Sequence, residues 1–168
     1  DMIKFAVDFP SPIAIRYPRG EAYDGLSDFR TPIVYGKSEI IYEESEIALI
    51  ALGSMVKTAE KVWETLKKEG YPCTLINARF AKPLDEELLT RLSRQYKLIV
   101  TLEENVILGG FGEHITKFLC GGKTCRILNI AIPDNYVEHG NVEILRKEIG
   151  IDEVSIIERV KAELEQLG

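Results

Sequence analysis

Apolar and polar positions alternate along most of the chain in a pattern that predicts strands and helices in turn. Short continuous apolar runs, typical of strands buried on both faces of a sheet, occur at residues 47–52, 73–76, 97–103 and 126–132. Segments with apolar residues at helical spacing separate and follow these runs. The order βαβαβαβαα predicts a three-layer α/β/α fold, with a mostly parallel sheet and helices on both of its faces.

The ends of the predicted helices carry residues that favour helix starts and stops. Ser54 can cap the first helix, whose apolar residues recur between Val56 and Leu66, and Gly70 can end it. Asp85 begins an acidic first turn in the second helix, where the helix dipole favours carboxylates. The second and later helices are predicted within residues 83–96, 109–122, 141–150 and 154–167.

The first 35 residues do not follow this alternation. The apolar run Ile13–Ile15 leads into "RYPRG" and predicts a strand over residues 13–17. Because a strand cannot bury itself alone and little sequence precedes this one, we expect residues 1–20 to be the tail of a truncated domain. Residues 21–35 are mostly polar without an apolar period, so we expect them to form a linker.

The remaining residues, 36–168, are expected to form the α/β domain itself. Gly36 and Lys37 follow the linker and precede a short β-rich piece at residues 40–42. We expect this piece to join the sheet as a short antiparallel edge strand. No internal repeat and no low-complexity segment divides the domain further.

Composition and charge narrow the classes of protein and of partner. The 168 residues are 45% hydrophobic and 29% charged, which is the balance of a soluble globular protein. The net charge is −6 and no basic stripe is interleaved with aromatics, which argues against a nucleic-acid surface. The longest apolar runs are too short to span a bilayer, and the first residues show no signal-peptide pattern. We therefore expect a cytoplasmic protein without nucleic-acid or membrane partners.

The cysteines are Cys73, Cys120 and Cys125. Their number is odd and no CxxC pair occurs, which favours three reduced thiols in a cytosolic protein. Zinc binding by Cys120 and Cys125 with a distant histidine is the alternative. Structural zinc requires four well-spaced ligands, which this spacing does not supply.

Polar residues gather after the predicted strands, at the edge where open α/β sheets bind ligands. Glu103 and Glu104 are consecutive, so on a strand they point to opposite faces and make a poor pair for acid–base catalysis. We expect one to accept hydrogen bonds inside the protein and the other to be solvated. The "GGFG" stretch, Gly109 to Gly112, precedes a helix and either cradles an anion or allows the helix to pack closely on the sheet.

Three further residues at this edge are candidates for binding. His114 and His139 are the only histidines and each follows a predicted strand end, so they are a candidate metal or catalytic pair. Arg79 can bind an anion, or it can fix a loop or a domain contact. Turns between strands and helices are polar in any case, so the residues alone leave these alternatives open.

Seven motifs occur in an order that points to a family. They are IRYPRG, ALGSMV, NARFAKPLDEELL, TLEEN, GGFGEHI, NIAIPDNYVEHG and LRKEIGID. Together they resemble the C-terminal part of enzymes of the transketolase-like family, and the resemblance covers essentially the whole chain. It implies a homodimeric bacterial enzyme with diphosphate-binding, pyrimidine-binding and C-terminal domains. It also implies dependence on thiamine diphosphate and a divalent metal, usually Mg²⁺.

In particular, the motifs resemble those of the members that condense pyruvate with glyceraldehyde 3-phosphate. That reaction releases CO₂ and gives 1-deoxy-D-xylulose 5-phosphate for isoprenoid, thiamine and pyridoxal synthesis. The resemblance implies that "RYPRG" ends the last strand of the pyrimidine-binding domain and that Arg19 holds the acceptor phosphate. An arginine fork at a rigid strand end suits a phosphate. Arg16 would point to the opposite face and is expected to form a structural ion pair.

The resemblance also implies a fragment that cannot catalyse the reaction alone. The family's "GDG…N" metal–diphosphate motif does not occur, and the catalytic glutamate would precede residue 1. We therefore expect no catalytic, cofactor-binding or metal-binding residue here, and no thiamine diphosphate or Mg²⁺ bound without the missing diphosphate- and pyrimidine-binding domains. Two alternatives remain open. One is a sister enzyme, transketolase or a 2-oxo-acid dehydrogenase β subunit; the other is a stand-alone α/β module that binds an anion at the GGFG edge.

Overall fold

The computed structural model describes residues 1–17, 23–121 and 125–167. The strands are β1 (Glu39–Tyr42), β2 (Ile47–Ala51), β3 (Cys73–Asn77), β4 (Leu98–Val106) and β5 (Arg126–Ile132). The helices are α1 (Met2–Val7), α2 (Met55–Lys68), α3 (Glu86–Gln95), α4 (Phe111–Leu119), α5 (Val142–Glu148) and α6 (Glu153–Leu167). The predicted alternation is confirmed from β2 to α6. None of the described helices combines the length and the apolar content that crossing a membrane requires.

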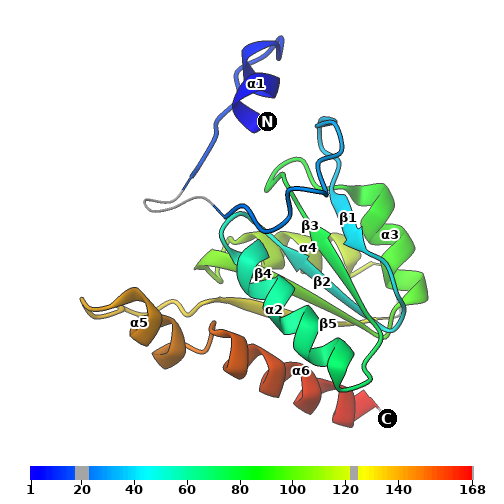
Figure 1. The fold of residues 1–168 in the computed structure, drawn as a ribbon, viewed down its shortest axis with the longest axis vertical. Helices are drawn as coiled ribbons and strands as arrows, with labels where there is room; N and C mark the ends of the chain where they lie inside the picture. The colour runs from blue at the N-terminus through cyan, green and yellow to red at the C-terminus, as the bar shows by residue number, and fades with distance from the viewer. Residues whose placement is uncertain (18–22, 122–124, 168) are drawn as a thin grey trace.

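The five strands form one sheet in the order β1-β3-β2-β4-β5 (Figure 1). Strand β2 is parallel to both β3 and β4, and β5 is parallel to β4. Strand β1 is antiparallel to β3 at one edge, with Glu39 opposite Asn77. The predicted antiparallel edge strand is therefore confirmed. The carboxyl ends of the parallel strands meet at one edge of the sheet.

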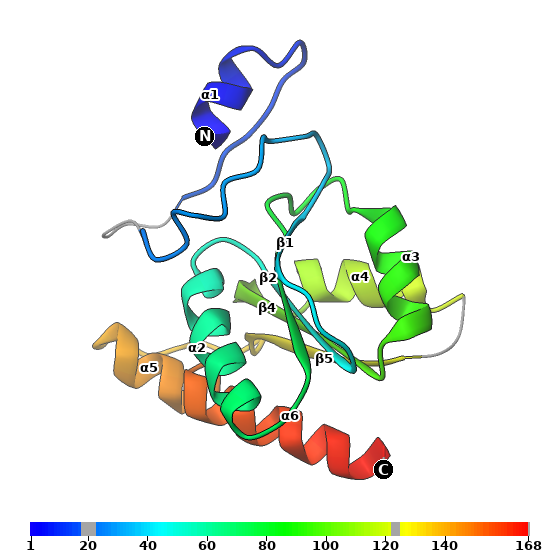
Figure 2. The same cartoon turned by 45° about the vertical axis from the view of Figure 1, so that its right-hand side comes forward.

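Helices cover both faces of the sheet, with α2 and α6 on one side and α3 and α4 on the other (Figure 2). Alternate residues of the central strand β2 serve the two faces. Leu49 and Ala51 pack with α2 and α6, whereas Ala48 and Ile50 pack with α3 and α4. Because every residue of β2 is buried, its sequence is a continuous apolar run and not an alternating one.

The helix ends follow the expected chemistry with one exception. The Asp85 carboxylate caps α3 by accepting a hydrogen bond from the Leu88 amide. Gly70 follows α2 with a φ of 88°, in the left-handed region that favours glycine. Ser54, however, makes no capping hydrogen bond through its side chain. The predicted cap is wrong because the Ser54 hydroxyl donates to the carboxylate of Glu104 instead, 2.7 Å away.

The strand predicted over residues 13–17 is absent. These residues form neither a helix nor a strand, and the described part of the chain places no strand beside them. A strand requires a neighbour for its backbone N–H and C=O groups, so the apolar run alone is insufficient. Helix α1 precedes the segment and lies apart from the sheet (Figure 1), with no buried residue of its own.

Four aromatic rings connect α1 and the residues after it to the α/β body. The Phe5 ring lies 5.3 Å from the Phe9 ring and 5.9 Å from the Phe80 ring, between centroids. The Tyr35 ring lies 4.8 Å from Phe9 and 5.8 Å from Phe80. Phe80 is buried just after β3. The first residues of the chain therefore contact the body near the carboxyl edge of the sheet.

Residues 23–35 contain no helix or strand, yet two of their side chains pack onto the body. Leu26 and Phe29 lie against the core on the face covered by α2 and α6. The Phe29 ring meets the Tyr42 ring edge-on with centroids 5.0 Å apart. This segment is therefore held along the sheet by apolar contacts, although its sequence is mostly polar.

Candidate functional site

The carboxyl edge of the parallel strands collects most of the residues that the sequence singled out. Glu103 and Glu104 lie near the end of β4, Arg79 follows β3, and the GGFG stretch leads from β4 into α4. Glu103 is buried with 2% of its surface exposed, whereas the Glu104 side chain is 28% exposed. The expectation that the two carboxylates point to opposite faces is consistent with their separate sets of partners.

Glu103 supplies its carboxylate to the start of α4. One oxygen accepts from the backbone N–H of Phe111 at 2.9 Å, and the other accepts from that of Gly112 at 2.8 Å. These amides are the donors that an anion would use at a helix N-terminus. The hypothesis of an anion cradle at Gly109–Gly112 is therefore wrong for an external ligand, because an internal carboxylate already occupies the donors.

Close packing accounts for Gly110 and Gly112, whereas Gly109 has a φ of 70°, in the left-handed region that favours glycine. A Cβ on Gly110 would lie 2.6 Å from the Glu103 carboxylate and from the Val106 carbonyl oxygen. A Cβ on Gly112 would clash with Thr101 Oγ1 and lie 2.7 Å from Asn129 Oδ1. At Gly110 and Gly112 this geometry supports the interpretation that the glycines allow the helix to pack closely on the sheet.

Glu104 joins three segments of the chain. Its Oε1 accepts from Arg146 of α5 through Nε at 3.0 Å and Nη2 at 2.7 Å. Its Oε2 accepts from the Ser54 hydroxyl, and its backbone carbonyl accepts from Arg16 Nη2 at 3.4 Å. Glu104 is thus paired and half-buried, not solvated as expected.

The protonation of Glu104 follows from these contacts. Burial opposes ionisation of the carboxyl, but the hydrogen bonds from Ser54 and Arg146 and the charges of Arg146 and Arg16 favour it. Together they hold the pKa of Glu104 below its ordinary value. Glu104 is therefore a fixed negative charge at neutral pH and an unsuitable general acid.

The two arginines of "RYPRG" stand differently in the structure. Arg16 donates to the carbonyl oxygen of Glu104, with the carboxylate of the same residue near enough to interact electrostatically. The hydrogen-bond partner of Arg16 is therefore a backbone carbonyl group, whereas the sequence led us to expect a carboxylate in a structural ion pair. Arg19, the residue expected to hold the acceptor phosphate, lies outside the described residues.

Arg79 fixes a loop, as one of its two interpretations predicted. Its guanidinium donates to the carbonyl oxygens of Thr31 at 2.9 Å and Pro32 at 3.3 Å. It also pairs with Glu39 at 2.7 Å, and both side chains are nearly inaccessible, at 7% and 4% exposure. The guanidinium of Arg79 is therefore occupied by its contacts with Glu39 and with the segment before β1, and it is not free to bind an external anion.

The other candidates form no common site in the described part of the chain. His114 and His139 are both exposed, and no hydrogen bond joins their side chains to one another. Among the described residues, no group of three or more His, Cys, Asp or Glu side chains is placed to hold a metal ion. Cys120 and Cys125 are therefore not part of such a group. The thiols of Cys73, Cys120 and Cys125 are free.

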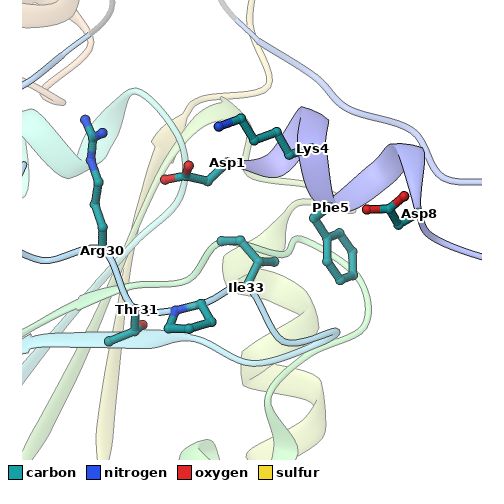
Figure 3. Close-up of a pocket in the computed structure, with 8 residues that line it drawn as sticks. Asp1, Lys4, Phe5, Asp8, Arg30, Thr31 and Ile33 are labelled. Atoms are coloured by element: carbon teal, nitrogen blue, oxygen red, sulfur yellow. The ribbon is translucent and has the colours of Figure 1, made fainter.

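A shallow cavity of about 410 Å³ lies between α1 and the segment before β1 (Figure 3). Its charged lining consists of Asp1, Lys4, Asp8 and Arg30, with Phe5 on the side of α1. The two acidic side chains balance the two basic ones. The cavity therefore lacks the excess of positive charge that phosphate binding requires.

Two partners of Glu104 were not foreseen from the sequence. Ser54 was interpreted as a helix cap and Arg146 as an ordinary residue of a closing helix. Glu104 and Arg146 are 42 residues apart, and only the fold brings α5 next to the end of β4. The sole signal in the sequence was the position of Glu104 at a strand end.

Comparison with known families gives this arrangement a context. Residues 36–156 match the family described as "Transketolase, C-terminal domain". The chain belongs to the transketolase C-terminal domain family. The match begins at residue 36, where the α/β domain was expected to begin.

Two relatives of this chain carry the same name. A 1-deoxy-D-xylulose-5-phosphate synthase of Lachnoclostridium phytofermentans is 50% identical over 161 residues, which are 95% of this chain and 26% of the relative. A protein of the same name from Heliobacterium modesticaldum is 40% identical over 165 residues, covering 97% of this chain and 25% of the relative. The chain thus spans about a quarter of the length of the curated relatives it matches.

Solved structures confirm the transketolase C-terminal fold. A split-gene transketolase described as an inactive β4 tetramer superposes with a TM-score of 0.80, at 23% identity, over 96% of this chain and 52% of that chain. A transketolase from Campylobacter jejuni superposes with a TM-score of 0.58 at 18% identity, over 78% of this chain and 19% of that chain. At these identities the likeness concerns the fold alone.

Proposed function

We propose that this chain is the C-terminal portion of a 1-deoxy-D-xylulose-5-phosphate synthase. The observation that carries the proposal is the 50% identity to a relative of that name, over 95% of this chain. The family match and the α/β/α fold agree with it. In this proposal residues 1–20 are the tail of the pyrimidine-binding domain, residues 21–35 are a linker and residues 36–168 are the C-terminal domain.

The whole enzyme would be a homodimer of the bacterial cytoplasm. It condenses pyruvate with glyceraldehyde 3-phosphate, with loss of CO₂, to 1-deoxy-D-xylulose 5-phosphate. Thiamine diphosphate, held with Mg²⁺, supplies the carbanion chemistry when bound. The α/β body contacts the first residues of the chain through the rings of Phe80 and Tyr35.

The described residues do not fit the cofactor. The Glu103 carboxylate occupies the amides at the start of α4 that a diphosphate would use. The described residues offer no three-ligand cluster for Mg²⁺. We therefore assign the cofactor and metal to the preceding domains of the synthase, which are the expected partners of this domain.

Arg19 is proposed to hold the phosphate of glyceraldehyde 3-phosphate, on the strength of the "RYPRG" motif. The test is Arg19→Ala in the full-length synthase. A charge-assisted contact contributes about 1.5–3 kcal/mol, so the KM for glyceraldehyde 3-phosphate should rise by about one to two powers of ten. The KM for pyruvate and the affinity for thiamine diphosphate should change little, because the contact touches only the acceptor.

Two further variants sharpen this test. Arg19→Lys should recover part of the loss, since it restores the charge but not the planar fork. Arg126→Ala removes an arginine whose partner is Glu163, at the opposite edge of the sheet, and should leave both constants unchanged. An Arg19→Ala enzyme with an unaltered KM for the acceptor would disprove the assignment.

The cofactor assignment has a test of its own. Calorimetric titration of the 168-residue chain with thiamine diphosphate and Mg²⁺ should give no saturable heat. The full-length synthase serves as the positive control under the same conditions. Binding of micromolar affinity to the short chain would contradict the assignment.

The alternatives have weaker support. Transketolase is the name of the two solved structures described above, but identities of 23% and 18% extend only to the fold. No observation favours a 2-oxo-acid dehydrogenase β subunit. A stand-alone anion-binding module would need free donors at the GGFG stretch, and Glu103 occupies them.

A further inference from the structure

Helix α5 and the loop before it, residues 133–148, have no apolar face buried in the body. No residue of α5 is buried, whereas α6, which follows it, buries Ile156, Ile157 and Val160 in the core. Figure 2 shows α5 next to the start of α6, at the end of the molecule away from α3. Because packing of an apolar face supplies most of the stability of a helix in a protein, α5 must be held by other contacts.

The apolar side chains of residues 133–148 do not attach the segment to the core. Tyr136 is fully exposed, and Val142 and Ile144 are each 59% exposed. Leu145 packs on the preceding loop instead, since a Cβ on Gly140 would lie 3.6 Å from Leu145 Cδ2. All of these residues are described, and none belongs to the two apolar clusters that form the core.

An ion pair attaches the segment to the end of β4. Arg146 donates to Glu104 Oε1 through Nε at 3.0 Å and Nη2 at 2.7 Å, and the two side chains are 29% and 28% exposed. Ser54, at the start of α2, donates to the other carboxylate oxygen at 2.7 Å and so restrains Glu104. In the described part of the chain, no other side chain of residues 133–148 forms a hydrogen bond or an ion pair with the body.

The backbone is held on both sides of this segment. Before it, the carbonyl oxygen of Ile132 accepts from the Ile107 amide at 2.9 Å and continues the pairing of β4 with β5. After it, Ile149 packs against the core, and Gly150 turns the chain toward α6 with a φ of 71°. A movement of residues 133–148 is therefore confined between these two points and leaves α6 in place.

We propose that residues 133–148 form an arm that is latched to the body by the Arg146–Glu104 ion pair and opens there while the sheet stays folded. Local opening requires least free energy where few apolar contacts are lost, and this opening breaks mainly the charge-assisted hydrogen bonds of Arg146. The open arm uncovers Glu104 and Ser54 at the carboxyl edge of the sheet, where α/β proteins bind ligands. The inference goes beyond the proposed function and does not depend on it.

The test is hydrogen–deuterium exchange of the 168-residue chain, followed by NMR at single amides over a series of low urea concentrations. The reporters are the amides of residues 145–148 in α5, of which Leu145 donates to the Asn141 carbonyl at 3.0 Å. They should share one rate of opening that changes little with urea, because opening of the arm exposes little surface. The amides of Leu49 and Val100 in the buried strands should exchange far more slowly and respond steeply to urea.

Two variants examine the latch itself. Glu104→Gln and Arg146→Met should each speed exchange of residues 145–148 by about five- to thirtyfold, because each removes the contact that opening must break. The double variant should match the single ones, since both remove the same ion pair. If α5 only frays while the ion pair stays formed, neither variant speeds its exchange, and the inference is overturned.

A matched control separates the latch from a general effect of removing a surface charge. Glu163→Gln removes a carboxylate 2.7 Å from Arg126, in an ion pair that joins α6 to β5, and should leave exchange in α5 unchanged. Equal acceleration of α5 by Glu163→Gln would contradict the proposal. So would exchange of residues 145–148 at the rate and with the urea dependence of Leu49. If Glu104→Gln does not fold, Arg146→Met decides the question alone, because its partly exposed side chain lies on the arm and not in the sheet.

Discussion

The amide of Gly112 donates to the buried carboxylate of Glu103 at 2.8 Å, in the first turn of α4. The pair joins the end of a strand to the start of the helix that follows it. A negative charge at a helix N-terminus satisfies unpaired donors and interacts favourably with the helix dipole. The Glu103 carboxylate is therefore the anion that binds the amides of the glycine-rich turn at the start of α4.

Glu103→Gln should lower the free energy of unfolding by about 1.5–3 kcal/mol, because one amide oxygen cannot replace two charged acceptors. The measurement is urea denaturation of the 168-residue chain followed by circular dichroism. Glu158→Gln, on an exposed position of α6, is the control and should change stability by less than about 0.5 kcal/mol. Equal stability of both variants would show that the buried carboxylate is dispensable.

Gly112→Ala should destabilise the protein by about 1–3 kcal/mol through overpacking. The added methyl group would meet Thr101 and Asn129, whose side chains are joined by a 2.7 Å hydrogen bond and cannot move apart freely. Gly121→Ala is the matched control, since a Cβ there meets nothing within 4 Å. Thermal denaturation of both variants distinguishes close packing from a general effect of removing glycine.

Arg79→Met should destabilise the protein by about 3–5 kcal/mol, because it leaves the Glu39 carboxylate buried without its countercharge. The double variant with Glu39→Met should lose less than the sum of the two single variants, since it leaves no charge unpaired. The Arg91–Glu43 pair, with 41% and 52% exposed side chains, is the control, and Arg91→Met should cost at most about 1 kcal/mol. Strict additivity at Arg79 and Glu39 would argue against coupling.

The three cysteines should react with a thiol reagent in a fixed order. Cys120 is exposed and should react first, whereas burial raises the pKa of Cys125 and slows its reaction. Burial raises the pKa of Cys73 much further, so Cys73 should react only when the protein unfolds. Cys120→Ser should remove the fast phase of a kinetic trace at pH 8. A fast phase that survives this substitution would contradict the order.

The elements of the α/β body were predictable because each follows from local chemistry. A strand buried on both faces must be apolar throughout, as β2 is, and an amphipathic helix must repeat its apolar residues, as α2 does. The same reasoning failed for residues 13–17. Their apolar run has strand character, but pairing depends on a neighbour that no local pattern can report.

The pairing of charges could not be predicted from the sequence. The sequence determined the order of strands and helices, the motifs of the family and the placement of polar residues at one edge of the sheet. It did not determine that Glu103 would serve the amides of α4, or that Glu104 would gather Ser54, Arg146 and Arg16. Periodicity arises from the geometry of one element, whereas these contacts join residues 8 to 88 positions apart. Only the tertiary structure decides which of them meet.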